Sequence, residues 1–175
     1  MQRPMASLKI LGAALLCALA AGCATTEQIS AAGDVRAFLI SIRDDDRAAF
    51  DAHVDRPALE RQLESRILRR VDTSDHRVAA RALAAVLARP LSQLAGDALL
   101  QPQVFRSVAE YYGYKPDMPI PSEFTIAQAL RGLPDNRVCA AKSHSGPCLM
   151  TFAQEDGVWR LVSFDGDPSM LRLSR

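Results

Sequence analysis

Residues 148–164 read CLMTFAQEDGVWRLVSF, two apolar runs separated by Glu155-Asp156-Gly157. Asp-Gly between two such runs is a strong signal for a β-hairpin, because both residues tolerate the backbone of a tight turn. The preceding run, residues 137–141, adds a strand before a first turn at residues 143–146. The sequence therefore predicts a three-strand antiparallel meander near the C-terminus.

The stretch upstream of this sheet has a helical pattern, beginning at Gly33. Its first apolar stripe recurs at i, i+3, i+4 and i+7 and consists of Val35, Phe38, Leu39 and Ile42. This spacing places all four side chains on one face of a helix. We expect Asp34 to cap that helix, because a carboxylate there accepts hydrogen bonds from free amides of the first turn.

Asp44, Asp45 and Asp46 interrupt this helix. Three adjacent carboxylates suggest calcium binding, but the calcium loop needs alternating oxygens, a glycine and a distal glutamate, and this stretch lacks that spacing. We therefore expect a solvated turn in which Asp45 or Asp46 caps a short helix through Phe50 and His53.

Two longer helices are expected next. Asp55-Arg56-Pro57 opens the first, since proline fits the first turn of a helix. Its core stripe consists of Leu59, Leu63, Ile67 and Val71. Residues 78–100 are rich in Ala and Leu with few charges, which predicts a helix buried on more than one side or covering a cavity. Pro90 should kink or split it, and Gln101-Pro102 starts another helix.

A proline-rich connector at residues 113–121 separates the helical half from the strands. Residues 124–130 fit either a short helix or a strand. The predicted fold class is α+β, with an N-terminal helical half followed by a C-terminal antiparallel meander in one domain, residues 33–175. A helical opening followed by a terminal antiparallel sheet also resembles the nuclear-transport-factor-two-like cone folds.

The N-terminus has the order of a secretory signal: Arg3 and Lys9, an apolar run at residues 10–21, then Ala21-Gly22-Cys23. Small residues before a cysteine are typical of a bacterial lipobox. We expect a signal peptide at 1–22, a diacylglycerol on Cys23 and a tether at 23–32. The alternatives are an ordinary cleaved secretory signal and a retained transmembrane helix, for which the apolar run is short against the roughly 20 residues needed.

Export to an oxidising compartment would allow the remaining cysteines to form a disulfide. Cys17 lies inside the leader, which leaves Cys139 and Cys148 as an even pair in an oxidising compartment. If the first turn of the meander centres on Ser143 and His144, these two cysteines face each other within disulfide reach. We expect a structural disulfide, with two free buried thiols as the alternative.

The run DRPALERQL at residues 55–63 resembles the helix-opening motif of a bacterial family named only as domain of unknown function 2939. Residues 44–50 and the ending GVWRLV at 157–162 also resemble that family, and the resemblance spans roughly residues 33–173. It implies a small exported or membrane-attached domain and supplies no catalytic residues. The Cys139 and Cys148 pair departs from the family pattern.

Few residues suggest chemistry. His53, His76 and His144 are dispersed over separate segments, and the sequence has no glycine-rich phosphate loop, no His-Glu-x-x-His and no Gly-x-Ser-x-Gly. Asp165 and Asp167 are more consistent with a terminal turn than with a cation site. We expect no catalytic residue, metal or cofactor. The residues expected to line a ligand pocket, or else to cover the core, are Tyr111, Tyr112, Tyr114 and Trp159.

The net charge of the chain argues against some classes of binding partner. The formal net charge is only +1, and no basic excess points to nucleic acid, so none is expected. The arginines of residues 61–70 suit a solvated face better than anionic lipid. We expect a periplasm-facing envelope lipoprotein, held to a membrane through Cys23, whose domain binds an unidentified protein or an apolar ligand. The alternative is a small-molecule enzyme or binding protein with a cone-shaped pocket.

Overall fold

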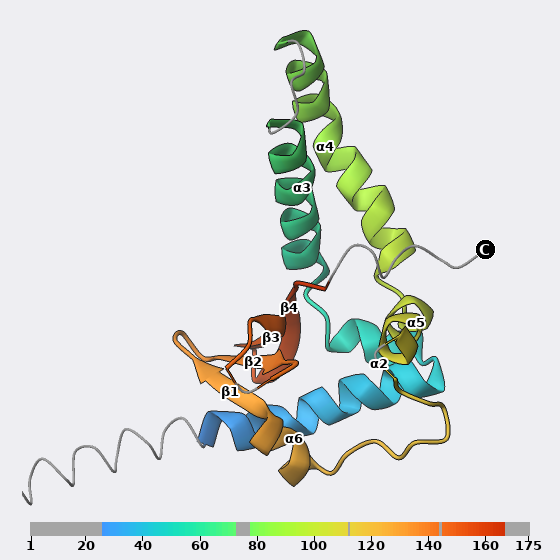
Figure 1. Ribbon diagram of the computed structural model, residues 1–175, viewed down its shortest axis with the longest axis vertical. Helices are drawn as coiled ribbons and strands as arrows, with labels where there is room; N and C mark the ends of the chain where they lie inside the picture. The colour runs from blue at the N-terminus through green and yellow to red at the C-terminus, as the bar shows by residue number, and fades with distance from the viewer. Residues whose placement is uncertain (1–25, 73–77, 112, 144, 167–175) are drawn as a thin grey trace, which may run out of the picture.

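The computed structural model describes residues 26–72, 78–111, 113–143 and 145–166. Helices precede a four-stranded antiparallel sheet, which confirms the α+β class (Figure 1). The elements are a first helix at 26–44, α2 (Arg47–Ala52), α3 (Arg56–Asp72), α4 (Val78–Leu99), α5 (Pro102–Tyr111), α6 (Glu123–Ala129), β1 (Leu130–Leu133), β2 (Arg137–Ala141), β3 (Cys148–Glu155) and β4 (Val158–Phe164).

The first helix begins earlier than expected. Residues 26–32, predicted as part of a tether, are its first turns, and Ala31 and Ala32 are buried because they continue the apolar stripe of Val35 upstream. Asp34 therefore lies inside the helix and is not its N-cap. Its carboxylate instead accepts a hydrogen bond of 2.8 Å from the backbone N–H of Trp159 in β4.

The aspartate turn was predicted correctly. Asp45 has a positive φ of 58°, and Asp46 is the N-cap of α2, accepting from the backbone N–H of Ala49 at 3.0 Å. Asp55 accepts in the same way from the N–H of Ala58 at the start of α3. An aspartate side chain therefore accepts a backbone hydrogen bond in the first turn of both helices.

The sheet has the order β1-β2-β3-β4, every neighbouring pair being antiparallel. The Asp156-Gly157 turn between β3 and β4 has positive φ at both residues, 52° and 84°, as a tight hairpin turn requires. β1 is one strand more than the predicted meander contained, and it follows directly on α6. Beyond β4, Val54 forms a parallel bridge with Leu161.

The core lies between the sheet and the helices. Phe38 is fully buried, and its ring lies 5.5–5.8 Å, centroid to centroid, from the rings of Phe50, Phe105 and Phe152. The first helix runs along the sheet, and α2 and α5 lie near the C-terminal end of this helix (Figure 1). All members of the buried core cluster fall between Ala31 and Leu161.

Candidate functional site

α3 and α4 form a hairpin that projects away from the core (Figure 1). α4 continues through Pro90 without being split. The prediction that α4 is buried on more than one side is wrong, because four of its large apolar side chains are exposed. Their exposed fractions are 73% for Val86, 43% for Leu87, 50% for Leu91 and 70% for Leu94.

Three of these side chains form a stripe. α4 faces α3 through Ala88 and Ser92, which are 0% and 1% exposed. Leu87, Leu91 and Leu94 follow one another at spacings of four and three, so they lie together on an adjoining face of the helix. We call these three residues the leucine stripe. Val86 points to a different side, away from both the stripe and α3.

Polar side chains fasten the base of the hairpin to the body. Arg56 donates to the carboxylate of Asp51 at 2.7 Å and to the carbonyl of Leu100 at 2.8 Å, which joins α2, α3 and the end of α4. Gln62 accepts from the N–H of Phe164 at 3.0 Å and donates to Ser163 at 2.8 Å.

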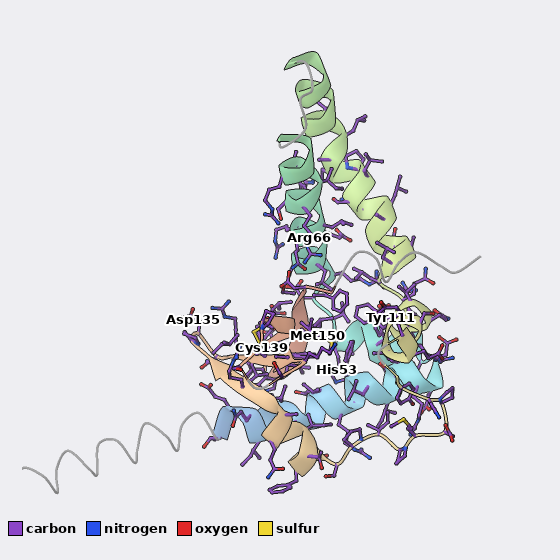
Figure 2. The ribbon with its side chains drawn as sticks, viewed as in Figure 1. His53, Arg66, Tyr111, Asp135, Cys139 and Met150 are labelled. Carbon is purple, nitrogen blue, oxygen red and sulfur yellow. A yellow bond between two sulfur atoms is a disulfide. The ribbon has the colours of Figure 1, made fainter. Side chains whose placement is uncertain are left out.

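Arg66 adds a third contact at the same place (Figure 2). Its guanidinium donates to the carbonyl of Phe164 at 2.8 Å and forms an ion pair with Asp165. Asp165, expected in a terminal turn, therefore receives bonds from α3. These contacts extend from Arg56 to Arg66, over the first eleven of the 17 residues of α3, and the end of α3 lies beyond them.

The sequence from the middle of α3 to the middle of α4 is strongly basic. Residues 66–89 contain six arginines and two aspartates, with no lysine or glutamate, although the whole chain carries only +1. Arg89 is exposed on α4. The α3–α4 segment thus combines the exposed leucine stripe with a local excess of positive charge in its sequence.

Arginine partners lower the pKa of two carboxylates, Asp44 at the end of the first helix and Asp51 in α2. The hydrogen bond from Arg43 lowers the pKa of Asp44, and the same bond raises the pKa of Arg43. For Asp51, partial burial acts to raise the pKa, but hydrogen bonds from Arg56 and Arg47 outweigh it and hold that pKa below its usual value. Both shifts arise from structural ion pairs.

The predicted disulfide between Cys139 and Cys148 is present, with Cα atoms 5.5 Å apart. The expected register is wrong, because Cys139 pairs with Thr151 and Cys148 pairs with Ala141. An irregularity between Ala140 and Ala141 shifts the pairing of β2 with β3. The two sulfurs therefore meet between residues that are diagonal neighbours, not direct partners, on the two strands. The intervening loop is therefore longer than a turn centred on residues 143 and 144.

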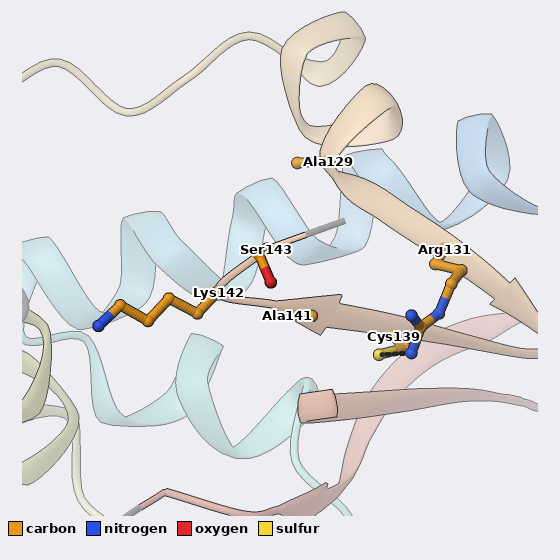
Figure 3. A pocket seen from close by; sticks show the side chains of 6 residues that line it. All are labelled: Ala129, Arg131, Cys139, Ala141, Lys142 and Ser143. Atoms are coloured by element: carbon orange, nitrogen blue, oxygen red, sulfur yellow. Dashed lines mark hydrogen bonds between the residues drawn. The ribbon is translucent and has the colours of Figure 1, made fainter. Parts of the chain in front are cut away.

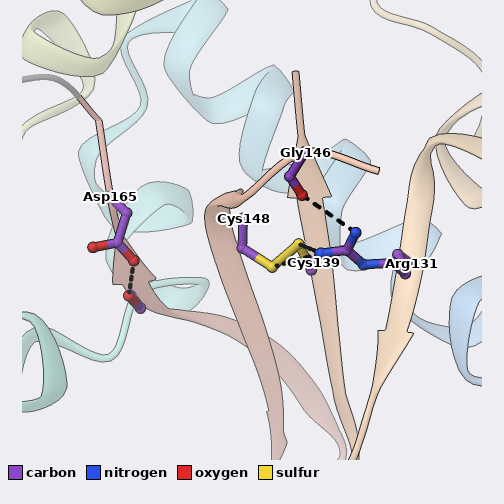
Figure 4. Close-up of a disulfide and its surroundings, with 6 residues drawn as sticks. Arg131, Cys139, Gly146, Cys148 and Asp165 are labelled. Atoms are coloured by element: carbon purple, nitrogen blue, oxygen red, sulfur yellow. Dashed lines mark hydrogen bonds between the residues drawn. A yellow bond between two sulfur atoms is a disulfide. The ribbon is translucent and has the colours of Figure 1, made fainter. Parts of the chain in front are cut away.

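Arg131 of β1 covers this disulfide (Figure 4). Its Nη2 lies 3.5 Å from Cys139 Sγ and 3.3 Å from Cys148 Sγ, and its Nη1 donates to the carbonyl of Gly146 at 3.3 Å. Arg131 and Cys139 are direct partners in the β1–β2 register, which explains why they meet.

A small open pocket lies beside Arg131 and the disulfide (Figure 3). Its volume is about 230 Å³, and it is lined by Ala129, Arg131, Cys139, Ala141, Lys142 and Ser143. The side chain of Lys142 extends away from Arg131 in this view, so the two cations do not converge on one point.

Of the aromatic residues predicted to line a ligand pocket, the three that the structure describes lie in different environments. Tyr111 is 67% exposed on α5, and Tyr112 lies outside the described residues. Tyr114 is half-buried with its hydroxyl enclosed, whereas Trp159 is 2% exposed and donates through its ring N–H to Ser30 at 3.2 Å. Trp159 thus belongs to the core beside the first turns of the first helix.

The histidines do not assemble a catalytic set among the described residues. His53 Nε2 lies 3.6 Å from Asp34 Oδ1, which is a contact between the end of α2 and the first helix. The other ring nitrogen, Nδ1, bonds the carbonyl of Ala49 within α2 at 2.8 Å. His76, His144 and Asp167 lie outside the described residues. Within the described ranges, no group of three or more His, Cys, Asp or Glu side chains is placed to hold a metal ion.

The membrane predictions at the N-terminus are untested by the fold. Residues 1–25, with the expected signal peptide and the lipid site at Cys23, lie outside the described part of the chain. In the part that is described, no helix combines the length and the apolar character needed to cross a bilayer.

Comparison with known proteins found no match: no family model, no curated protein and no solved structure matches this chain. The resemblance to domain of unknown function 2939 therefore stays a prediction. The leucine stripe is the site that sequence reasoning missed. Its signal was present in the alternating spacing of four and three, which is typical of a helix–helix seam.

Proposed function

We propose that this protein is a bacterial envelope lipoprotein, attached through Cys23 and facing the periplasm, whose domain is a non-enzymatic binding module. Its occupant is an amphipathic helix with acidic flanks, supplied by another envelope protein, that packs on the leucine stripe of α4. The observation that carries the proposal is the exposure of the stripe on a projecting hairpin. Contiguous exposed apolar side chains mark interaction surfaces in soluble domains.

The spacing of the stripe favours a helical partner. Residues four and three apart present a straight row of knobs, which another helix accommodates between its own side chains. Helix-in-groove recognition uses this arrangement of anchors along one apolar face. A flat strand, with its two-residue repeat, matches the row less well.

The charge of the hairpin favours an acidic partner. Residues 66–89 carry a net charge of +4 from six arginines and two aspartates. Opposite charges around an apolar contact speed association and select among partners, while the apolar contact supplies affinity. The stripe itself contains no charged residue, so no charge needs to be buried.

Attachment is tested at Cys23. The full chain is expressed in a Gram-negative host and followed by membrane fractionation and acyl labelling. We expect label and membrane recovery for the wild type and loss of both for Cys23→Ser. An unlabelled wild type would contradict the lipoprotein part of the proposal.

Binding is tested by site-specific photo-crosslinking in living cells. A p-benzoylphenylalanine is placed at position 91 in the stripe, and the matched control carries it at position 86, which is exposed on another side of α4. We expect a protein adduct from position 91 only. The partner peptide, sequenced by mass spectrometry, should be an amphipathic helix flanked by Asp and Glu.

Three results overturn this proposal. Equal adducts at positions 86 and 91 would mean that the stripe is not selective. Adducts of position 91 to a second copy of this chain, or to lipid, would replace the helical partner by a dimer or by a membrane surface.

A further inference from the structure

The Cys139–Cys148 disulfide lies outside the hydrophobic core. Val138 and Ala140 point toward the core cluster, and Cys139 between them points to the opposite face of the sheet. Cys139 is nevertheless 0% exposed, whereas Cys148 is partly exposed. Cys148 is therefore the more exposed residue of the pair.

The guanidinium of Arg131 is placed where a thiolate would form. It lies within 3.5 Å of both sulfurs, which are neutral and only weak hydrogen-bond acceptors while they are bonded to each other. Cleavage of the disulfide places a full negative charge on a sulfur beside this cation. Arg131 therefore interacts more strongly with the product of cleavage than with the disulfide, which favours the reaction.

We propose that Cys139, Cys148 and Arg131 form a thiol–disulfide exchange site whose substrates are small-molecule thiols or protein dithiols. The site is independent of the leucine stripe and of the proposed helical partner. It gives the C-terminal sheet a reactive disulfide where the sequence predicted a structural one.

The exchange proceeds in two balanced steps. An incoming thiolate attacks the Sγ of Cys148, the more exposed residue of the pair, and forms a mixed disulfide with it. The Cys139–Cys148 bond breaks, and its electron pair stays on Cys139 Sγ as a thiolate beside Arg131. A lower-energy leaving thiolate departs faster, so the cation accelerates this step.

A second thiolate then attacks the incoming sulfur of the mixed disulfide and releases Cys148. Two thiols are oxidised to one disulfide, and the protein disulfide is reduced by two electrons. The protons of the two thiols end on Cys139 and Cys148 or in solvent.

The test measures reduction of the full chain by glutathione at neutral pH. Free thiols are trapped with iodoacetamide at intervals, and peptide mass spectrometry follows Cys139 and Cys148 separately from Cys17 and Cys23. We expect Arg131→Gln to slow reduction roughly three- to tenfold, since it removes the charge beside the leaving thiolate. Arg131→Lys keeps a cation and should retain more of the wild-type rate.

The matched control is Arg137→Gln. Arg137 lies on β2, but its guanidinium bonds Pro134 and Asp135 at the β1–β2 turn. This variant should reduce at the wild-type rate. In the reduced protein, the pH midpoint of Cys139 alkylation, followed by peptide mass spectrometry, should rise in Arg131→Gln and stay unchanged in Arg137→Gln, a shift that a purely structural role does not produce.

A second measurement covers the case in which Arg131→Gln does not fold. Wild-type reduction is compared in buffer and in denaturing urea, and the exchange site requires that the folded pair react without prior unfolding of the chain. Reduction of the folded chain that proceeds only through unfolding, or equal rates for wild type and a folded Arg131→Gln, overturns the proposal.

Discussion

The body and the α3–α4 hairpin use apolar side chains in opposite ways. In the body, Phe38 is enclosed by three other phenylalanine rings and has no exposed surface. On the hairpin, Leu94 is 70% exposed although it lies within the regular helix α4. The body needs its apolar residues to fold, whereas the hairpin presents its leucines to solvent.

The two regions also differ in what holds them together. Buried aromatic contacts join the first helix, α2, α5 and β3 in the body. The hairpin is fastened at its base by the polar contacts of Arg56, Gln62 and Arg66 and by one buried core residue, Leu59. Because such contacts contribute about 1 kcal/mol each, the hairpin should open locally at lower cost than the body unfolds.

The largest expected effect is at the centre of the body. Phe38→Ala removes a ring that contacts Phe50, Phe105 and Phe152, and it should lower the free energy of unfolding by about 3–5 kcal/mol. Urea denaturation followed by the fluorescence of Trp159, the single tryptophan, measures the change.

Leu94→Ala is the matched change on the hairpin. It should alter the free energy of unfolding by no more than about 0.5 kcal/mol, because most of the side chain is already exposed. A loss of 2 kcal/mol or more, on the order of a core truncation, would show that the leucine stripe is covered by the folded chain itself.

The next effect concerns the joint between the first helix and the sheet. Asp34→Ala leaves the backbone N–H of the buried Trp159 without its carboxylate acceptor. An unsatisfied buried donor costs about 1–3 kcal/mol. Urea denaturation should show this loss, and Asp34→Asn, which keeps an acceptor oxygen, should lose less. Equal losses for the two variants would point to charge as the cause.

Much of the body was predictable because local rules and tertiary packing agree there. The stripe of Val35, Phe38 and Ile42, the cap at Asp46 and the turn at Asp156-Gly157 all follow from short-range patterns. Asp34 shows the limit of such rules. A carboxylate near a helix start fits an N-cap, but here it is bonded to a strand 125 residues away in sequence, which no local pattern reports.

The candidate site was predictable only in part. The Cys139–Cys148 pairing followed from the parity of the cysteines and from the hairpin, yet its register depended on an irregularity that a pattern of alternation does not show. Arg131 was missed because β1 was not recognised as a strand. The apolar character of α4 was clear from its sequence. Composition does not say, however, whether its apolar side chains pack against the same chain or against another protein.

A smaller effect is expected at the base of the hairpin. Gln62→Ala removes the bonds to Ser163 and to the N–H of Phe164, at a cost of roughly 0.5–1.5 kcal/mol. Hydrogen exchange should rise in the first turns of α3 and at the end of β4. The exposed Gln93 of α4 supplies the control, Gln93→Ala, which should leave exchange unchanged. Faster exchange throughout the body would contradict a local clamp.

The smallest effect expected in the body is a pH dependence from Asp51. Arg56 and Arg47 hold its pKa below the ordinary value, so the ionised form stabilises the fold above about pH 4, and this stabilisation is lost as pH falls through the lowered pKa. Because the carboxylate is 38% exposed, screening limits the contribution to roughly 0.5–1 kcal/mol.

Asp51→Asn should therefore be less stable than wild type by that amount at pH 7, and the difference should shrink in urea denaturations performed below about pH 4. Asp156→Asn is the control, since Asp156 lies in the exposed β3–β4 turn at a positive φ that asparagine also adopts. It should be near wild type at both pH values. If the Asp51→Asn difference persists unchanged in acid, hydrogen-bond geometry and not ionisation of Asp51 fastens α2 to the base of the hairpin.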